Sequence, residues 1–401
     1  MASFRKQIYF SLALLVPALG VRAMGADIAT DASVEQRLKA LEQQVQVLTD
    51  ENRQLQKELG HIAPVVASIL QPGGKETKLV IGGFLQAQAE FGRAADPRWN
   101  GVRDRFYFRR ARIYVAGNVA EDFEFKGELD LQGNTLGAAT GQVTRANEVY
   151  INWHKYSFAN IRFGQLKTAY SAEALLSDGK MPTEERSLSS DRLSDPRQLA
   201  LAALGDLFDG KVSYYAVLAD GNGPNVSAND NSKFQKSLRV TGTPYASKED
   251  KISVGVDGLW STDAGVTKND FGFTGNLFTG KREMWGVDAQ WAHGPLEVTG
   301  EILHGTFRPT NAVPYARFEA EGWQATLSYF IVPTKFQAVL RHEEFDPNTA
   351  LSGNTIRTNT IGVNYFFKGD DLKLMIDYLN GVVPGSNFDG GRLLTRFQIA
   401  Y

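Results

Sequence analysis

Short segments of alternating apolar and polar residues repeat along the chain from Leu79 to its last residue. The final segment is typical, since Leu393, Phe397, Ile399 and Tyr401 share one face of a strand and mostly polar residues share the other. A strand has period two, so one face is apolar and the other is polar. A soluble sheet turns such an apolar face to its core. A transmembrane barrel turns it to lipid and leaves the polar face to a wet lumen.

The lengths of the connections between the segments separate these two architectures. Sixteen candidate strands span 79–91, 105–119, 122–131, 145–154, 159–167, 197–204, 209–219, 234–245, 251–262, 282–292, 295–305, 318–332, 335–345, 357–367, 371–379 and 392–401. The connections after even-numbered strands are short, and those after odd-numbered strands are long and polar. Outer-membrane barrels have this asymmetry, with periplasmic turns and longer extracellular loops. We therefore predict an all-β transmembrane barrel of 16 antiparallel strands over residues 79–401.

The segment before the barrel has a different pattern. Residues 1–23 predict a signal peptide, with a basic start, an apolar run too short to span a bilayer and a small-residue cleavage site. Residues 33–59 carry a heptad repeat that predicts an α-helical, periplasmic coiled coil, and residues 60–78 predict a linker. A single amphipathic helix lying on the barrel is the alternative. Asn52 at an a position favours dimers among coiled coils.

Composition argues against several functions. The net charge of −2 leaves no basic excess with which to bind nucleic acid. The chain has no cysteine, and its five histidines show no zinc-ligand spacing. No nucleophile motif or phosphate-binding motif stands in a suitable context. We expect no enzyme activity, no catalytic residue, no metal and no cofactor.

The longest connection, residues 168–196, is the first candidate for a functional segment. Loops longer than about 15 residues are uncommon unless they have a function. This one contains Leu175-Leu176, Met181-Pro182 and Leu188, which would be out of place in an exposed hairpin. We predict that it folds into the barrel, packs these residues on the inner wall and narrows the pore. An outer cap or a contact between subunits is the alternative.

Charged residues on the inward faces and in this loop are the candidate site. The predicted pore-lining anion path comprises Arg110, Arg112, Arg162, Lys167, Lys180, Arg186 and Arg239. The predicted acidic part of the constriction comprises Glu184, Glu185 and Asp191. A purely structural role is the alternative, because the strand pairing places Arg112 opposite Glu128 or Asp130.

Two stretches resemble the phosphate-selective porin O and P family. They are Phe108 to Gly117 followed by Glu124 to Leu131, and Phe163 to Lys167 followed by Ala172 to Ser177 and Glu185 to Ser187. The resemblance implies a sixteen-stranded barrel with a coiled-coil prefix, assembly into homotrimers, and a third loop folded into each pore. Anion-specific members are notably basic at the constriction. Here residues 167–197 carry five basic and six acidic groups, which leaves phosphate selectivity open.

Together these features predict an outer-membrane porin of a Gram-negative-type cell, surrounded by outer-membrane lipid. It would allow passive diffusion of small hydrophilic solutes, with a preference for anions or phosphate. The alternative is a structural anchor whose coiled coil tethers the periplasm and whose pore is blocked.

Overall fold

A computed structural model describes residues 39, 42–47, 49–50, 78–132, 136, 143–310, 316–382 and 389–401. The chain divides into two units, residues 1–72 and 73–401. The described residues of the first unit are helical and exposed. The predicted signal peptide, most of the heptad repeat and nearly all of the linker lie outside the described residues, so the coiled coil stays a prediction. No helix among the described residues has both the length and the apolar character needed to cross a bilayer.

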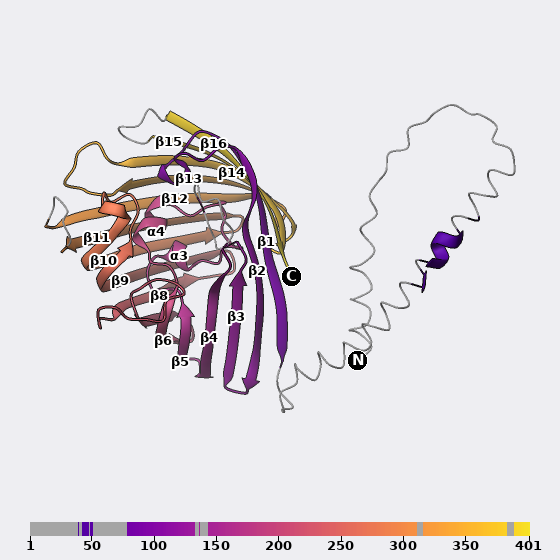
Figure 1. Cartoon of the computed structure of the whole chain (residues 1–401), viewed down its shortest axis with the longest axis horizontal. Helices are drawn as coiled ribbons and strands as arrows, with labels where there is room; N and C mark the ends of the chain where they lie inside the picture. Colours follow the sequence, from indigo (N-terminus) through magenta and orange to yellow (C-terminus); the bar gives the residue numbers. More distant parts are fainter. Residues whose placement is uncertain are drawn as a thin grey trace. The chain divides into compact units, whose positions relative to one another are not determined.

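The second unit is a closed barrel of sixteen antiparallel strands (Figure 1). The strands are β1 (Leu79–Gly92), β2 (Arg105–Ala120), β3 (Phe123–Asp130), β4 (Arg145–Tyr156), β5 (Ala159–Leu166), β6 (Gln198–Leu207), β7 (Val212–Ala219), β8 (Gln235–Ala246), β9 (Asp250–Thr267), β10 (Leu277–His293), β11 (Leu296–Pro309), β12 (Phe318–Val332), β13 (Phe336–Asp346), β14 (Ile356–Lys368), β15 (Leu372–Val382) and β16 (Asp389–Ala400). Each strand pairs with its neighbours in sequence. The predicted sixteen-stranded barrel is confirmed.

Closure of the barrel depends on the last strand. β16 pairs with β15 on one side and with β1 on the other, with Phe84 opposite Ala400. The Gly83 amide donates to the Tyr401 carbonyl at 2.9 Å, and the Tyr401 amide donates to the Gly83 carbonyl at 3.1 Å. No strand edge is therefore left open at the seam, which removes the site at which sheets usually aggregate.

The alternation of turns and loops follows the prediction, and the largest difference in extent is at the β9–β10 connection. β9 and β10 form a longer hairpin than expected, so their loop covers 268–276 rather than 263–281. The ladder continues because its polar residues have partners in the lumen. Asp263 and Arg282 face inward and form an ion pair between their side chains. Two single-turn 3-10 helices lie in the loops, η1 (Pro97–Trp99) and η2 (Thr274–Asn276).

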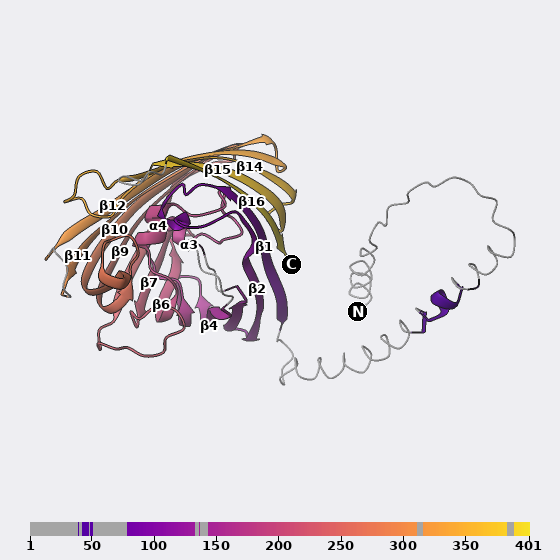
Figure 2. The same ribbon diagram turned by 45° about the horizontal axis from the view of Figure 1, so that its top comes forward.

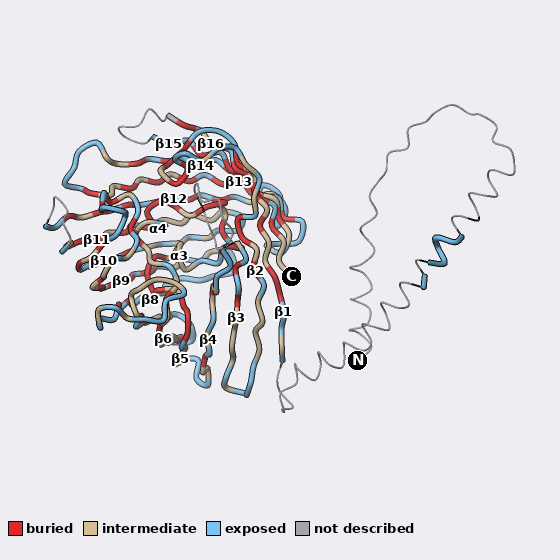
Figure 3. The backbone as a smooth tube through the Cα atoms, viewed as in Figure 1, coloured by how far each residue is buried: buried red, intermediate tan, exposed pale blue. Residues whose placement is uncertain are grey.

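Buried and exposed residues alternate along the strands of the barrel (Figure 3). The residue types are the reverse of those in a soluble protein. The outward Trp285, Val287 and Trp291 of β10 are exposed, whereas the inward Arg392 and Arg396 of β16 are fully buried. An exposed apolar outer wall around a charged interior is the arrangement that a bilayer requires. The interior charges are therefore where a functional site would lie.

Candidate functional site: the lumen and loop L3

The connection between β5 and β6, residues 167–197, is here named L3. It holds two short helices, α3 (Ala172–Leu175) and α4 (Leu188–Leu193), which lie within the ring of strands (Figure 2). Each begins at a serine cap, where Ser171 accepts from the Ala174 amide and Ser187 accepts from the Ser190 amide. α4 contacts β11, β12 and β13. L3 thus folds inward, against the inner wall of the barrel.

Apolar side chains hold one part of L3 in place. Leu188 and Leu193 of α4 and Tyr170 are buried in a cluster with phenylalanines of the wall and of the β9–β10 loop. These phenylalanines are Phe271, Phe273, Phe278, Phe307, Phe318 and Phe345. Met181 is also buried, but Leu176 is 38% exposed, so the predicted packing of L3 leucines on the wall is only partly observed. The contribution of the β9–β10 loop was not predicted.

Hydrogen bonds to its backbone hold the middle of L3. The Glu184 amide donates to Asp377 Oδ2 at 2.6 Å. Wall side chains donate to three L3 carbonyls: Asn364 to Pro182 at 2.7 Å, Arg341 to Glu185 at 2.7 Å, and Lys373 to Met181 at 3.3 Å. These contacts come from β13 to β15. Gln398 of β16 and Gln86 of β1 donate to the Gly179 and Asp178 carbonyls at 3.0 and 3.4 Å, so L3 follows the wall from β13 to β1.

Two adjacent carboxyls in L3 have opposite electrostatic environments. Glu185 accepts from Arg109 at 2.7 and 2.8 Å and also pairs with Arg396. Burial alone would raise the pKa of Glu185, but Arg109 and Arg396 outweigh it and hold that pKa well below its usual range. Burial raises the pKa of Glu184 well above its usual value. Arg396, whose Nε lies 3.9 Å away, opposes this rise, and the like charge of Asp377 adds to it. The pKa values of the two adjacent carboxyls are therefore shifted in opposite directions.

Asp178 is the point at which L3 meets the facing wall. Its carboxylate pairs with Arg112 at 2.7 Å, with Arg110 at 3.2 Å and with Arg186 at 2.6 Å. Burial would raise the pKa of Asp178, but the three arginines hold it well below its usual range. This cluster, here named the Asp178 clamp, joins L3 to β2.

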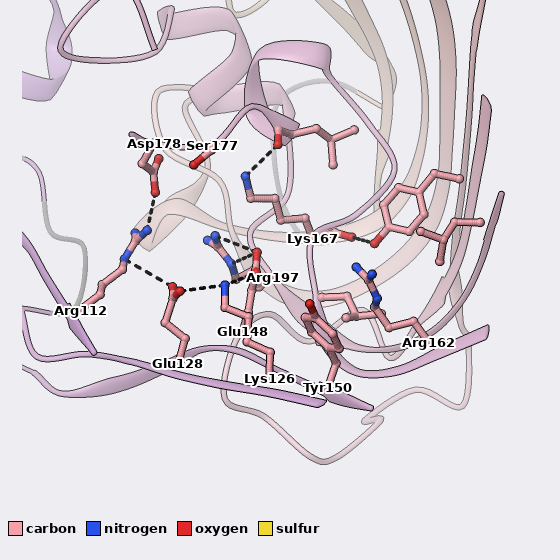
Figure 4. Close-up of a pocket in the computed structure, with 14 residues that line it drawn as sticks. Arg112, Lys126, Glu128, Glu148, Tyr150, Arg162, Lys167, Ser177, Asp178 and Arg197 are labelled. Atoms are coloured by element: carbon pink, nitrogen blue, oxygen red, sulfur yellow. Dashed lines mark hydrogen bonds and ion pairs between the residues drawn. The ribbon is translucent and has the colours of Figure 1, made fainter. Parts of the chain in front are cut away.

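Cavities lie on both sides of the Asp178 clamp. The extracellular cavity, of about 430 Å³, is lined by the β1–β2 and β9–β10 loops together with Arg110 and Arg186. The periplasmic cavity, of about 580 Å³, is lined by the β14–β15 turn, by β1 to β3 and by Asp178. The side cavity, of about 310 Å³, lies between L3 and β2 to β7 and shares Arg112 and Asp178 with the periplasmic cavity (Figure 4). The clamp thus separates an outer chamber from two inner ones.

Lys167 stands where β5 enters L3, on the side cavity. Its ammonium donates to the carbonyls of Ala174, Leu175 and Leu176 at 2.9 to 3.1 Å, at the C-terminal end of α3. Burial, followed by the charges of Arg197 and Arg186, lowers the pKa of Lys167 to about 7. The lysine therefore titrates near neutral pH.

The structure brings some predicted site residues together and separates others. Arg112, Arg162 and Lys167 line the side cavity, and Arg110, Arg186, Glu185 and Asp191 line the extracellular cavity. Glu184 is buried against the wall, and Lys180 is exposed on L3. Arg239 pairs with Asp257 at 2.6 Å and Asp288 at 2.7 Å, near β9 and β10. Arg112 lines a cavity and also pairs across strands with Asp130 at 2.9 Å.

Sequence reasoning missed several charged residues that line the cavities. These are Arg98, Arg109, Lys126, Glu128, Glu148, Arg192, Arg197 and Asp270. The alternation along β3 carried a usable signal, because Lys126, Glu128 and Asp130 fall on the polar face. The loop residues carried no such signal. In the described part of the chain, no three His, Asp or Glu residues form a group that could hold a metal.

A closed sixteen-stranded barrel with an inward third loop and a charged lumen defines a porin. The family described as phosphate-selective porin O and P matches residues 84–387, and the chain belongs to this family. The match to the family identifies an outer-membrane channel protein rather than an enzyme, and it favours a porin over a structural anchor.

Individual proteins resemble the chain at low identity. Porin O of Pseudomonas aeruginosa is 24% identical over 308 residues, covering 68% of each chain. Among solved structures, the anion-selective porin from Comamonas acidovorans has 12% identity and a TM-score of 0.58, covering 81% of this chain and 100% of that one. The channel DcaP of Acinetobacter baumannii has 15% identity and a TM-score of 0.56, covering 82% and 99%. At these identities the structures show a shared fold alone.

Proposed function

We propose that this porin is anion-preferring and that small hydrophilic solutes pass between L3 and the β2–β7 wall. The observation that carries the proposal is the excess of cations around the extracellular cavity and around the side cavity. Five cations line the extracellular cavity: Arg98, Arg109, Arg110, Arg186 and Arg192. Three acids face them: Glu185, Asp191 and Asp270. Anions would therefore gather at the outer face of the constriction.

The side cavity has the same balance. Its cations are Arg112, Lys126, Arg162, Lys167 and Arg197, and its acids are Glu128, Glu148 and Asp178. Rings of charged side chains in a narrow, partly dehydrated passage set the sign of ion selectivity. Guanidinium groups suit anions because their planar fork matches carboxylates and phosphates. An anion leaving the outer chamber would meet a second cationic region beyond the Asp178 clamp.

The acids limit how strong this preference can be. Asp178 neutralises arginines at the clamp, and Glu148 pairs with Lys126 at 3.1 Å and Arg197 at 3.2 Å. The family is described as phosphate-selective, and one solved relative is described as an anion-selective porin. These descriptions support an anion preference, and the paired acids support a mild one rather than tight phosphate binding.

Assembly into a homotrimer is part of the proposal. One solved structure with the same fold, OmpT of Vibrio cholerae, is described as a trimer form. The apolar outer wall could be shared between lipid and neighbouring subunits. Chemical cross-linking of purified protein in mild detergent should give a trimer band, and a monomer band alone would contradict this assembly.

Planar-bilayer recording tests the channel. Purified protein should give stepwise ion currents, and the reversal potential in a potassium chloride gradient should have the sign of chloride preference. Absence of current at every voltage would favour the blocked anchor instead. Current with a potassium preference would keep the porin and refute the anion preference.

A further inference from the structure

The side cavity has two chemically different walls. Cationic groups of β3, β5 and L3 line part of it, as Figure 4 shows for Lys126, Arg162 and Lys167. Another part is apolar, lined by the side chains of Leu166, Leu175 and Leu204 and by the rings of Tyr150 and Tyr215. The cavity is also lined by Glu128, Glu148 and Asp178, which pair with its cations. A small inorganic anion would bind the cationic wall but would make no favourable contact with the apolar wall. The combination suits a ligand with one anionic group and an apolar body.

Arg162 is the cation best placed to meet such a ligand. Its guanidinium carbon lies 4.3 Å from the centroid of the Tyr150 ring, which holds the planar group in a fixed orientation. Its nearest described carboxylate is Glu124, at 3.8 Å from Nη2, and its Nε has no hydrogen-bond partner among the described residues. The ion pair with Glu124 is longer than a hydrogen bond, so the guanidinium can bind an incoming carboxylate through two parallel hydrogen bonds.

The other cations of the cavity already have partners. Lys126 pairs with Glu128 at 2.8 Å, Arg197 pairs with Glu148 at 3.2 Å, and the Lys167 ammonium donates to three carbonyls of L3. They would contribute a positive field rather than direct contacts. The direct contact therefore falls to Arg162, which stands on β5 beside the apolar wall.

The size of the cavity sets the size of the ligand. Its volume of about 310 Å³ is at the small end of the range of roughly 300–1,000 Å³ for small-molecule sites. This space is far larger than an inorganic anion needs and suits a single ring or a short branched chain. The apolar lining is shared by β5 and β6 of the wall and α3 of L3, so the ligand would lie against both sides of the passage.

We propose that the side cavity is a binding site for small organic monocarboxylates with an apolar body, aromatic ones above all. The carboxylate would bind Arg162, and the body would pack against Leu204 and Leu175. This proposal rests on the anion-preferring channel described above and names the class of solute that the channel selects. The channel would then select solutes by their apolar character as well as by their charge.

The test uses chloride current through the full-length porin in planar bilayers, with blockers added to the periplasmic side. Benzoate should halve the current at a concentration at least about tenfold below that of acetate, since an apolar pocket discriminates by this factor or more. Inorganic phosphate and the uncharged benzamide should be weaker than benzoate. Arg162→Gln should raise the half-blocking concentration of benzoate by roughly tenfold, the loss expected for one charge-assisted contact. Arg317→Gln removes an exposed arginine paired with Glu319, so it is the matched control and should change nothing.

A second variant isolates the apolar wall. Leu204→Asn should weaken block by benzoate and leave block by acetate unchanged, and Leu175→Asn on L3 is the substitute if the strand variant does not insert. Equal potency of benzoate and acetate, or of benzoate and benzamide, would overturn the site. The reversal potential, measured in the same bilayers, distinguishes a failure of this site from a failure of the proposed function. If the wild type prefers chloride but benzoate blocks no better than acetate or benzamide, this site alone is refuted. If the wild type has no chloride preference, the proposed function is refuted.

Discussion

Removing two arginines from the Asp178 clamp should convert it from a cationic to a neutral constriction. Asp178 has three arginine partners, at 2.7 Å for Arg112, 2.6 Å for Arg186 and 3.2 Å for Arg110. In the double variant Arg112→Gln/Arg186→Gln, side-chain size and hydrogen bonding are largely kept, but two positive charges are lost. Asp178 then faces the passage with one arginine instead of three.

The magnitude follows from the charge lost and its distance from the passage. A unit charge about 4 Å from a permeating ion contributes about 1–4 kcal/mol between the water and protein-surface limits. Two charges at the lower limit give about 2 kcal/mol, or roughly thirtyfold in relative permeability, since about 1.4 kcal/mol is tenfold. Salt screening over about 10 Å at 0.1 M reduces this. We expect a shift toward potassium of roughly three- to thirtyfold.

Reversal potentials in a potassium chloride gradient measure this shift directly. Asp178→Asn alone should move the ratio toward chloride. Arg112→Gln/Asp178→Asn removes one charge of each sign and is the matched control, so its ratio should stay near that of wild type. An unchanged ratio in the double arginine variant would show that these arginines only hold the structure together. Their placement in the anion path would then be wrong.

Three further outcomes follow from the sequence and the structure. Glu185→Gln should destabilise the barrel by about 3–5 kcal/mol by leaving buried arginines unpaired. Glu184→Gln should destabilise it less, because burial raises the pKa of Glu184 and so disfavours its charged form; heat-modifiable gel mobility compares the two. Burial and nearby arginines lower the pKa of Lys167 to about 7, so the chloride preference should fall as pH rises through neutrality, and Lys167→Gln should abolish that step. Leu41→Asp/Leu48→Asp, at heptad positions outside the described residues, should weaken cross-linked trimers without unfolding the barrel; an unchanged trimer yield would assign assembly to the barrel wall.

The barrel could be predicted from the sequence because its information is local. The alternation of apolar and polar residues along each strand shows which side chains face lipid and which face the lumen. A shift of one residue would move every side chain to the opposite face, so the alternation is strict. The strand ends were less certain because a polar residue can end a strand or find a partner in the lumen. Asp263 extends β9 for the second reason, and nothing near it in the sequence indicates that Arg282 would be its partner.

The site was predicted less completely because the sequence of L3 has no regular alternation of apolar and polar residues. Glu184 and Glu185 are adjacent and chemically alike, yet one lies against Asp377 and the other receives Arg109 and Arg396. Only the tertiary fold determines which of the two carboxyls lies beside another carboxyl and which one pairs with arginines. The inward Phe271 and Phe273 of the β9–β10 loop were a missed signal, because two phenylalanines in an exposed loop are as anomalous as the leucines of L3.

The partners of the inward arginines decide which of them a permeating ion can use. Arg239 lies between two aspartates, and Arg282 pairs with Asp195 at 2.9 Å and with Asp263. Arg341 donates to the Thr183 hydroxyl and the Glu185 carbonyl of L3 and pairs with the Glu173 carboxylate at 3.3 Å. Each is neutralised by the contact that holds the loop or the wall in place, so a count of arginines on the inner face overstates the positive field. Arg162 differs because Tyr150 orients it by stacking and its one carboxylate partner, Glu124, lies at 3.8 Å, beyond hydrogen-bond distance. In such a lumen most charged side chains hold L3 and the wall in place, and a few remain available to select permeating ions.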